Sequence, residues 1–187
     1  GYTHEAPGGG NFDGTEIAFE RHAANIQDTW LMCRVGERYQ YSNLGIELAG
    51  FIVGRASGTP FIDYMDRNVF AALGLGRTTM DPSRISAEPN RATGHQRGFG
   101  RLPVIAPMTA AGGVYASAHD LGTFLTFMLR EGQPGGHLLP PELFRQMYTT
   151  PNHGGYGLGV AVGRRRNGDL YFNHGGGGYG FLAYMAW

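Results

Sequence analysis

The hydrophobic pattern changes near residue 156, and this change restricts the fold more than any other feature of the sequence. Residues 156–162 alternate glycine with apolar side chains, a period of two that is typical of a half-buried strand. Asn167-Gly168 is a strong hairpin signal, and residues 170–174 return as a second strand. Residues 175–180 predict another turn, and residues 181–187 begin a third strand. The sequence therefore predicts an antiparallel meander at the end of the chain.

Ahead of this meander, apolar residues recur at helical spacing. Leu44, Leu48 and Phe51 share one face of a helix, and Ser117, with an acid three residues later, has the capping-box pattern. Thr59, just before a proline, predicts a second capping hydroxyl. The predicted helices cover approximately residues 15–27, 43–56, 60–71, 118–131 and 141–148. Residues 29–40 predict an extended, partly buried segment, and residues 81–107 predict a long surface loop of the kind that forms lids or cleft walls.

These elements predict an α+β fold in which an antiparallel sheet is flanked by helices. A helical lobe covers about residues 15–150, and the sheet strands cover about residues 156–187. A chain of 187 residues is one domain by length and can bury a real core. Because the chain ends inside its third predicted strand, we expect a single but partial domain, truncated at both ends.

Charge and composition exclude several functions. Fifteen basic residues balance fifteen acidic ones, so the sequence does not predict a nucleic-acid partner. No stretch approaches the roughly 18 apolar residues of a membrane span. The single Cys33 excludes an internal disulfide, and a periplasmic or secreted location and a cytoplasmic one both stay open. All fifteen basic residues are arginine, which excludes any mechanism that needs a lysine from this chain.

The first candidate site is the stretch Tyr39-Gln40-Tyr41-Ser42-Asn43, which leads into the helix predicted from about Asn43. Polar side chains at such a place usually cap the free N–H groups of the first turn. In the alternative interpretation, the phenol of Tyr41 and the amide of Asn43 project into a cleft. These residues alone do not decide between the two.

His174 is the second candidate, because it ends a predicted strand just before four glycines that would let a ligand approach the backbone. An ordinary turn histidine is the alternative. The seven histidines show no metal-ligand spacing, so we expect no metal site. The glycines at 175, 177 and 180 match the dinucleotide fingerprint, but a strand rather than a helix is predicted after them. We therefore expect no cofactor.

The serines offer no nucleophile of their own. None of the five lies in a Gly-x-Ser-x-Gly elbow, and none is followed three residues later by lysine. Ser117 already has a sufficient role as a helix cap.

Taken together, the ordered motifs resemble those of the serine β-lactamase-like hydrolases, which include class C β-lactamases, D-alanyl-D-alanine carboxypeptidases and esterases of the same fold. The resemblance extends from about His4 to Phe181, and a valine, Val35, stands where a proline is common. It rests on the motifs Gly36-Glu37-Arg38-Tyr39-Gln40-Tyr41-Ser42-Asn43, Ser57-Gly58-Thr59-Pro60-Phe61, Leu73-Gly74-Leu75, Ala111-Gly112-Gly113-Val114, Tyr156-Gly157-Leu158-Gly159 and His174-Gly175-Gly176.

The resemblance implies acyl transfer through a serine, activated by a lysine and a tyrosine. Tyr41 would be that tyrosine, Asn43 would bind the substrate amide, and His174-Gly175-Gly176 would replace a Lys-Thr-Gly strand. Gly177 would donate an N–H to the oxyanion hole. The substrate would be a small ester, β-lactam or D-amino-acid peptide. The histidine favours an ester, because it holds less positive charge at pH 7 than a lysine.

The Ser-x-x-Lys element of that family is absent from the chain. We expect it in an N-terminal segment upstream of Gly1, which would complete the site as a partner of this chain. This chain alone is then expected to be inactive. The alternative is a noncatalytic binding module that keeps the cleft without the nucleophile.

Overall fold

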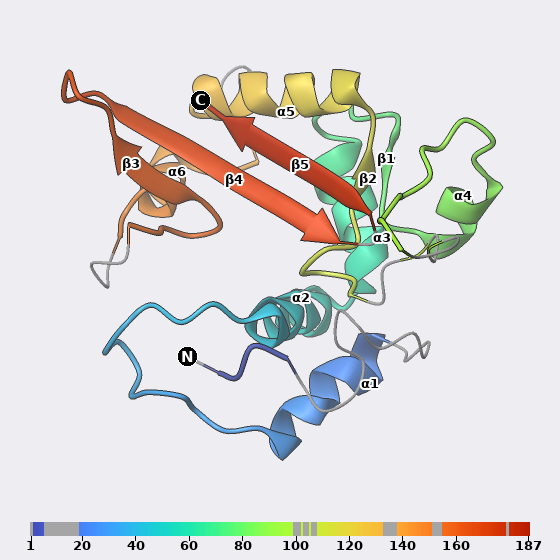
Figure 1. Cartoon of the computed structure of the whole chain (residues 1–187), viewed down its shortest axis with the longest axis horizontal. Coiled ribbons are helices and arrows are strands. Elements are labelled where there is room, and N and C mark those ends of the chain that lie inside the picture. Colours follow the sequence, from blue (N-terminus) through green and yellow to red (C-terminus); the bar gives the residue numbers. More distant parts are fainter. Residues whose placement is uncertain are drawn as a thin grey trace.

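The computed structural model describes residues 2–5, 19–98, 102, 105, 108–132, 138–150, 155–178 and 180–187. Helices and two antiparallel sheets make up a mixed fold, as the sequence predicts (Figure 1). The three-stranded sheet has the order β3-β4-β5 (Ala161–Arg164, Leu170–Gly178 and Phe181–Ala186), with helices α5 (Ala118–Leu129) and α6 (Pro141–Met147) packed against it through a shared core. Helices α1 (Phe19–Ala24) and α2 (Asn43–Ser57) lie on the other side of the molecule, next to the N-terminal segment (Figure 1).

The helices begin and end close to the predicted positions. Their bounds are α1 Phe19–Ala24, α2 Asn43–Ser57, α3 Phe61–Met65, α4 Pro82–Ala87, α5 Ala118–Leu129 and α6 Pro141–Met147. A 3₁₀ turn over Asn25–Asp28 extends α1, and a π-helical turn over Asp66–Phe70 extends α3. The start of the first predicted helix, residues 15–18, lies outside the described residues. Helix α4 was not predicted, and its Ile85 is buried, so part of the predicted surface loop belongs to the core.

Local capping explains why α2 and α5 begin where they do. Ser42 accepts a hydrogen bond from the N–H of Gly45, and Ser117 accepts one from the N–H of Asp120. The prediction for Thr59 is wrong, because the cap position of α3 is Pro60 and no side chain caps that helix. Thr59 lies one residue too early in the chain to reach the first turn.

The C-terminal meander is confirmed, but its first strand and its second turn differ from the prediction. The strand predicted over residues 156–162 is wrong for residues 156–160, of which only Tyr156 makes an isolated bridge, to Ala161, and the second turn is shorter than predicted. Strands β3 Ala161–Arg164, β4 Leu170–Gly178 and β5 Phe181–Ala186 are antiparallel neighbours. The glycines from 175 to 178 continue β4 and pair with residues 181–184 of β5. A glycine run can stay in a ladder when neighbouring side chains fill the missing volume. Here the side chains of Leu182 and Tyr184 lie over Gly177 and Gly175.

A second, two-stranded sheet pairs β1 Thr78–Thr79 with β2 Tyr115–Ala116 and was not predicted. Much of the described core lies in two clusters of buried residues. One surrounds Phe70, Leu75 and Met80, and the other joins Met128 of α5 and Phe144 of α6 to Val160.

The segment between α1 and α2 loops out to one side of the molecule (Figure 1). Trp30 and Val35 in it are 66% and 87% exposed, so the prediction of a partly buried approach is wrong for these side chains. Among the described helices, none combines the length and apolar character that crossing a membrane requires.

Candidate active site

Tyr41 and Asn43 lie side by side at the start of α2. The Tyr41 hydroxyl donates to Oδ1 of Asn43 at 2.7 Å, and Nδ2 of Asn43 donates to Oε1 of Glu5 at 2.5 Å. Asn43 is buried with 4% of its surface exposed, whereas Tyr41 is 48% exposed. The buried Asn43 amide therefore fixes the Tyr41 hydroxyl by a hydrogen bond, while about half of the tyrosine surface stays exposed to solvent.

The N-terminal segment fixes this helix start from outside. The carbonyl of His4 accepts the N–H groups of Asn43 and Leu44, and the Ser42 hydroxyl donates to the carbonyl of Thr3 at 2.6 Å. The His4 ring lies 5.1 Å from the ring of Tyr41. The capping interpretation is correct for Ser42. Tyr41 and Asn43 hydrogen-bond each other, and their projection into a cleft stays a prediction.

Two aromatic rings, those of Tyr156 and Tyr39, connect His174 to the segment just before Tyr41. His174 stands inside β4, opposite Met185, and not at a strand end as predicted. Its ring meets the edge of Tyr156 at 6.3 Å, and Tyr156 lies 5.1 Å from Tyr39. Burial raises the pKa of Tyr156, and the nearby phenols of Tyr39 and Tyr41 raise it further. Tyr156 thus contacts His174 on one side and Tyr39, two residues before Tyr41, on the other. We find no direct interaction between Tyr41 and His174 in the described part of the chain.

The predicted glycines 175–177 lie along the exposed part of β4. A methyl group added to Gly176 would meet nothing within 4 Å, so the backbone there is open to an approaching molecule.

Two polar groups of this region were not predicted as site residues. Tyr156 is expected from the sequence only as part of a strand and of the motif Tyr156-Gly157-Leu158-Gly159. Glu47 is not expected as a site residue either, although it is the one acid of a mainly apolar helix and lies one helical turn after Asn43.

Glu47 is fully buried, and its Oε1 accepts the N–H of Ala111 at 2.7 Å. Burial raises the pKa of Glu47 to about 7, against the opposing effect of backbone N–H groups at residues 109–111, and the charge of Glu5 raises it further. The other oxygen, Oε2, lies 3.9 Å from Nδ1 of the buried His22 on α1.

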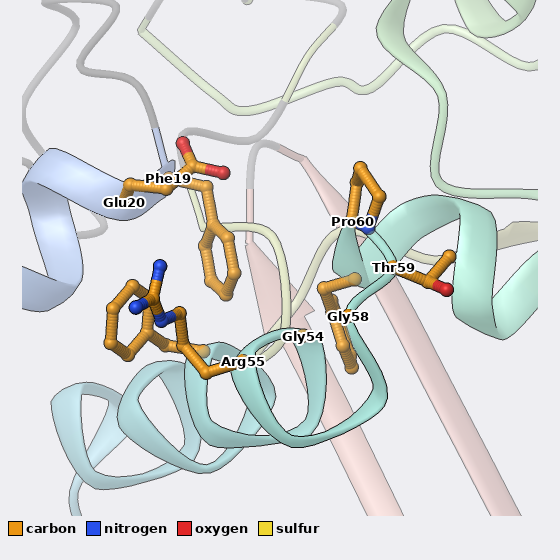
Figure 2. A pocket seen from close by; sticks show the side chains of 9 residues that line it. Phe19, Glu20, Gly54, Arg55, Gly58, Thr59 and Pro60 are labelled. Atoms are coloured by element: carbon orange, nitrogen blue, oxygen red, sulfur yellow. The ribbon is translucent and has the colours of Figure 1, made fainter.

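Two pockets in the described part of the structure do not include the Tyr41–Asn43 pair. Figure 2 shows a pocket of about 280 Å³ between α1, the C-terminal half of α2 and the start of α3, with Phe19 and Phe61 on its walls. Another, of about 380 Å³, lies between Tyr2 and residues 31–40. None of the predicted site residues lines either one. Within the described residues, no group of three or more His, Cys, Asp or Glu side chains could hold a metal ion.

The antiparallel sheet, its flanking helices and the helix that begins at Tyr41-Ser42-Asn43 define a β-lactamase/transpeptidase-like fold. The chain belongs to the Beta-lactamase family, whose model matches residues 2–186.

Among known proteins, the chain is 28% identical over 134 residues to a putative D-alanyl-D-alanine carboxypeptidase of Escherichia coli K12, covering 71% of this chain and 31% of that protein. The structure is similar to that of an octameric penicillin-binding protein homologue from Pyrococcus abyssi, with a TM-score of 0.80, 22% identity, and coverage of 95% of this chain and 43% of that one. It is also similar to a β-lactamase/D-alanine carboxypeptidase from Pseudomonas syringae, with a TM-score of 0.71, 22% identity, and coverage of 99% of this chain and 61% of that one. The chain thus spans about a third of the length of the Escherichia coli relative.

Proposed function

We propose that the protein to which this chain belongs is a serine hydrolase that works through an acyl-enzyme, with an ester as the favoured substrate over a β-lactam or a D-amino-acid peptide. The observation that carries the proposal is the Tyr41–Asn43 hydrogen bond, which presents a half-exposed phenol at the start of α2. Membership of the Beta-lactamase family supports it.

In this proposal Tyr41 moves the proton of the nucleophile, and Asn43 binds the substrate amide or acyl group when its present bonds rearrange. His174 donates a hydrogen bond to a substrate oxygen, and a backbone N–H of Gly177 contributes to the oxyanion hole beside Gly175 and Gly176. A histidine in this place carries less charge at neutral pH than a lysine, which favours an uncharged ester over a substrate with a carboxylate.

The nucleophile is a serine outside this chain, in a Ser-x-x-Lys segment. Ser42 is already engaged, because its oxygen accepts from Gly45 and its hydroxyl donates to Thr3. Ser117 is engaged as the cap of α5. The second candidate is a noncatalytic binding module, which the absence of lysine from the sequence favours.

The test uses the longer protein that contains this chain, with a chromogenic ester and a serine-reactive fluorophosphonate. We expect one labelled serine, followed three residues later by lysine. Replacing Tyr41 by Phe should lower kcat by about 10²- to 10⁴-fold with a smaller effect on KM. Tyr64→Phe on α3 is the matched control and should leave kcat unchanged. Saturable binding of ester without any labelled serine would support the binding module instead.

A further inference from the structure

Glu47 is an acid at the meeting point of three segments. Its side chain extends from α2 and accepts a hydrogen bond from Ala111, in the loop after Met108. It also lies close to His22 of α1, and the charge of Glu5 in the N-terminal segment acts on it. Its surface is completely buried. Burying a carboxyl group costs free energy that an apolar side chain of similar volume would not, so packing alone does not explain its presence.

The loop that Glu47 holds packs tightly against the same helix. One turn further along α2, a methyl group added to Gly50 would lie 2.5 Å from Cβ of Ala110. The loop turns back on itself through a hydrogen bond from Gly113 N–H to the carbonyl of Thr109. The remaining N–H of Ala111 points into the protein, and the Glu47 carboxyl is its acceptor.

Glu47 also lies next to the Tyr41–Asn43 pair. Residues 43 and 47 are one turn apart on the same buried face of α2. Asn43 bonds Tyr41 on one side and Glu5 on the other, and Glu5 is the acid whose charge acts on Glu47. A change of charge on Glu47 therefore acts on the acceptor that fixes the Asn43 amide.

We propose that Glu47 is a positioning residue for the Tyr41–Asn43 site: its buried carboxyl joins loop 109–113 and α1 to the helix turn that carries Asn43, and its ionisation changes how Tyr41 is held. The charged and titratable groups that face it are His22 from α1 and Glu5 from the N-terminal segment. The loop contributes backbone N–H groups, and Asn43 from α2 contributes its amide. The role assigned to Tyr41 rests on the proposed function.

The test is an NMR titration of the full chain from pH 4.5 to pH 9, following the Ala111 amide and the ring signals of Tyr41. It is made in a His4→Gln background, so that the imidazole beside Tyr41 produces no shift of its own. We expect both signals to move with one midpoint. In Glu47→Gln neither signal should change with pH. The chemical shift of the Ala111 N–H should stay near its original value, because the side-chain oxygen of the glutamine still accepts the hydrogen bond. Glu142→Gln, at an exposed position of α6, is the matched control and should change neither.

If the Ala111 amide titrates and Tyr41 does not, Glu47 only supports the loop and the proposal is wrong. The same holds if Tyr41 titrates unchanged in Glu47→Gln. Should that variant not fold, the shared midpoint of the two signals in the His4→Gln chain decides. Because the titration needs neither substrate nor nucleophile, its outcome is separate from the ester and fluorophosphonate experiment, whose failure would overturn the proposed function alone.

Discussion

The Tyr41 hydroxyl is a donor to Oδ1 of Asn43, and the other side of the amide dictates that direction. A carboxylate oxygen only accepts, so the bond to Glu5 turns Nδ2 of Asn43 toward Glu5 and leaves Oδ1 for Tyr41. The lone pairs of the phenol then face outward. The phenol can thus accept a hydrogen bond from another group without any movement of Asn43. Taking up a proton requires Tyr41 first to be a phenolate. Because a phenolate would set two oxygens without a hydrogen against each other, the Asn43 amide must then turn its Nδ2 toward Tyr41.

Replacing Asn43 by Ala should destabilise the chain by about 1–3 kcal/mol, since it leaves the Glu5 carboxylate and the Tyr41 hydroxyl without their partner. Urea unfolding at neutral pH measures this loss. Asn68→Ala is the matched control, because Asn68 is exposed and its side chain bonds the carbonyl of Tyr64, one helical turn earlier. That change should stay within about 0.5 kcal/mol. Equal effects of the two changes would contradict the inferred role of Asn43.

Glu47 should make the stability fall as the pH rises. Its folded-state pKa of about 7 lies above the ordinary value of 4.5, so the folded chain keeps a proton that the unfolded chain releases. The loss of unfolding free energy due to Glu47 is absent below pH 4.5 and grows between pH 4.5 and about 7. Above that pH it stays constant, at about 3 kcal/mol in total. The measurement is the free energy of unfolding of the chain and of Glu47→Gln at pH 4.5 and pH 8. A difference between them that does not change with pH would disprove the prediction.

Asp120 should have the opposite pH dependence. Burial raises the pKa of this carboxyl, but hydrogen bonds from the Thr78 hydroxyl and the Arg77 N–H outweigh burial, so the pKa is lowered on balance. The stabilisation is therefore present above the unfolded pKa of 3.8 and is lost as the pH falls through the folded value. Asp120→Ala should cost about 1–3 kcal/mol at pH 7 and less in acid. The exposed Asp63→Ala serves as control, and its thermal midpoint should change little at either pH.

The predictions that the structure confirms rest on residues close to one another in the sequence. The helices at Ser42 and Ser117 were predicted because their caps lie within three residues of the N–H groups that they bind. The error at Gly175–Gly178 has a different cause: glycines predict a turn, but β5 pairs with them, and its Leu182 and Tyr184 side chains lie over Gly177 and Gly175. Tyr156 and Glu47 were missed because their neighbours His174 and Ala111 are distant in sequence. The roles of Tyr41, Asn43 and His174 stay predictions.

Two glycines in helices provide a test of the contact between α2 and the loop that follows Met108. A methyl group at Gly50 would lie 2.5 Å from Cβ of Ala110, whereas one at Gly122 of α5 would meet nothing within 4 Å. Alanine stabilises an open helix by about 0.5–1 kcal/mol relative to glycine, so Gly122→Ala should raise the urea midpoint. Gly50→Ala should lower it, since forcing the loop away costs about 1–3 kcal/mol. A higher midpoint for both variants would show that the loop does not press against α2 and would remove the packing on which the position of Glu47 depends.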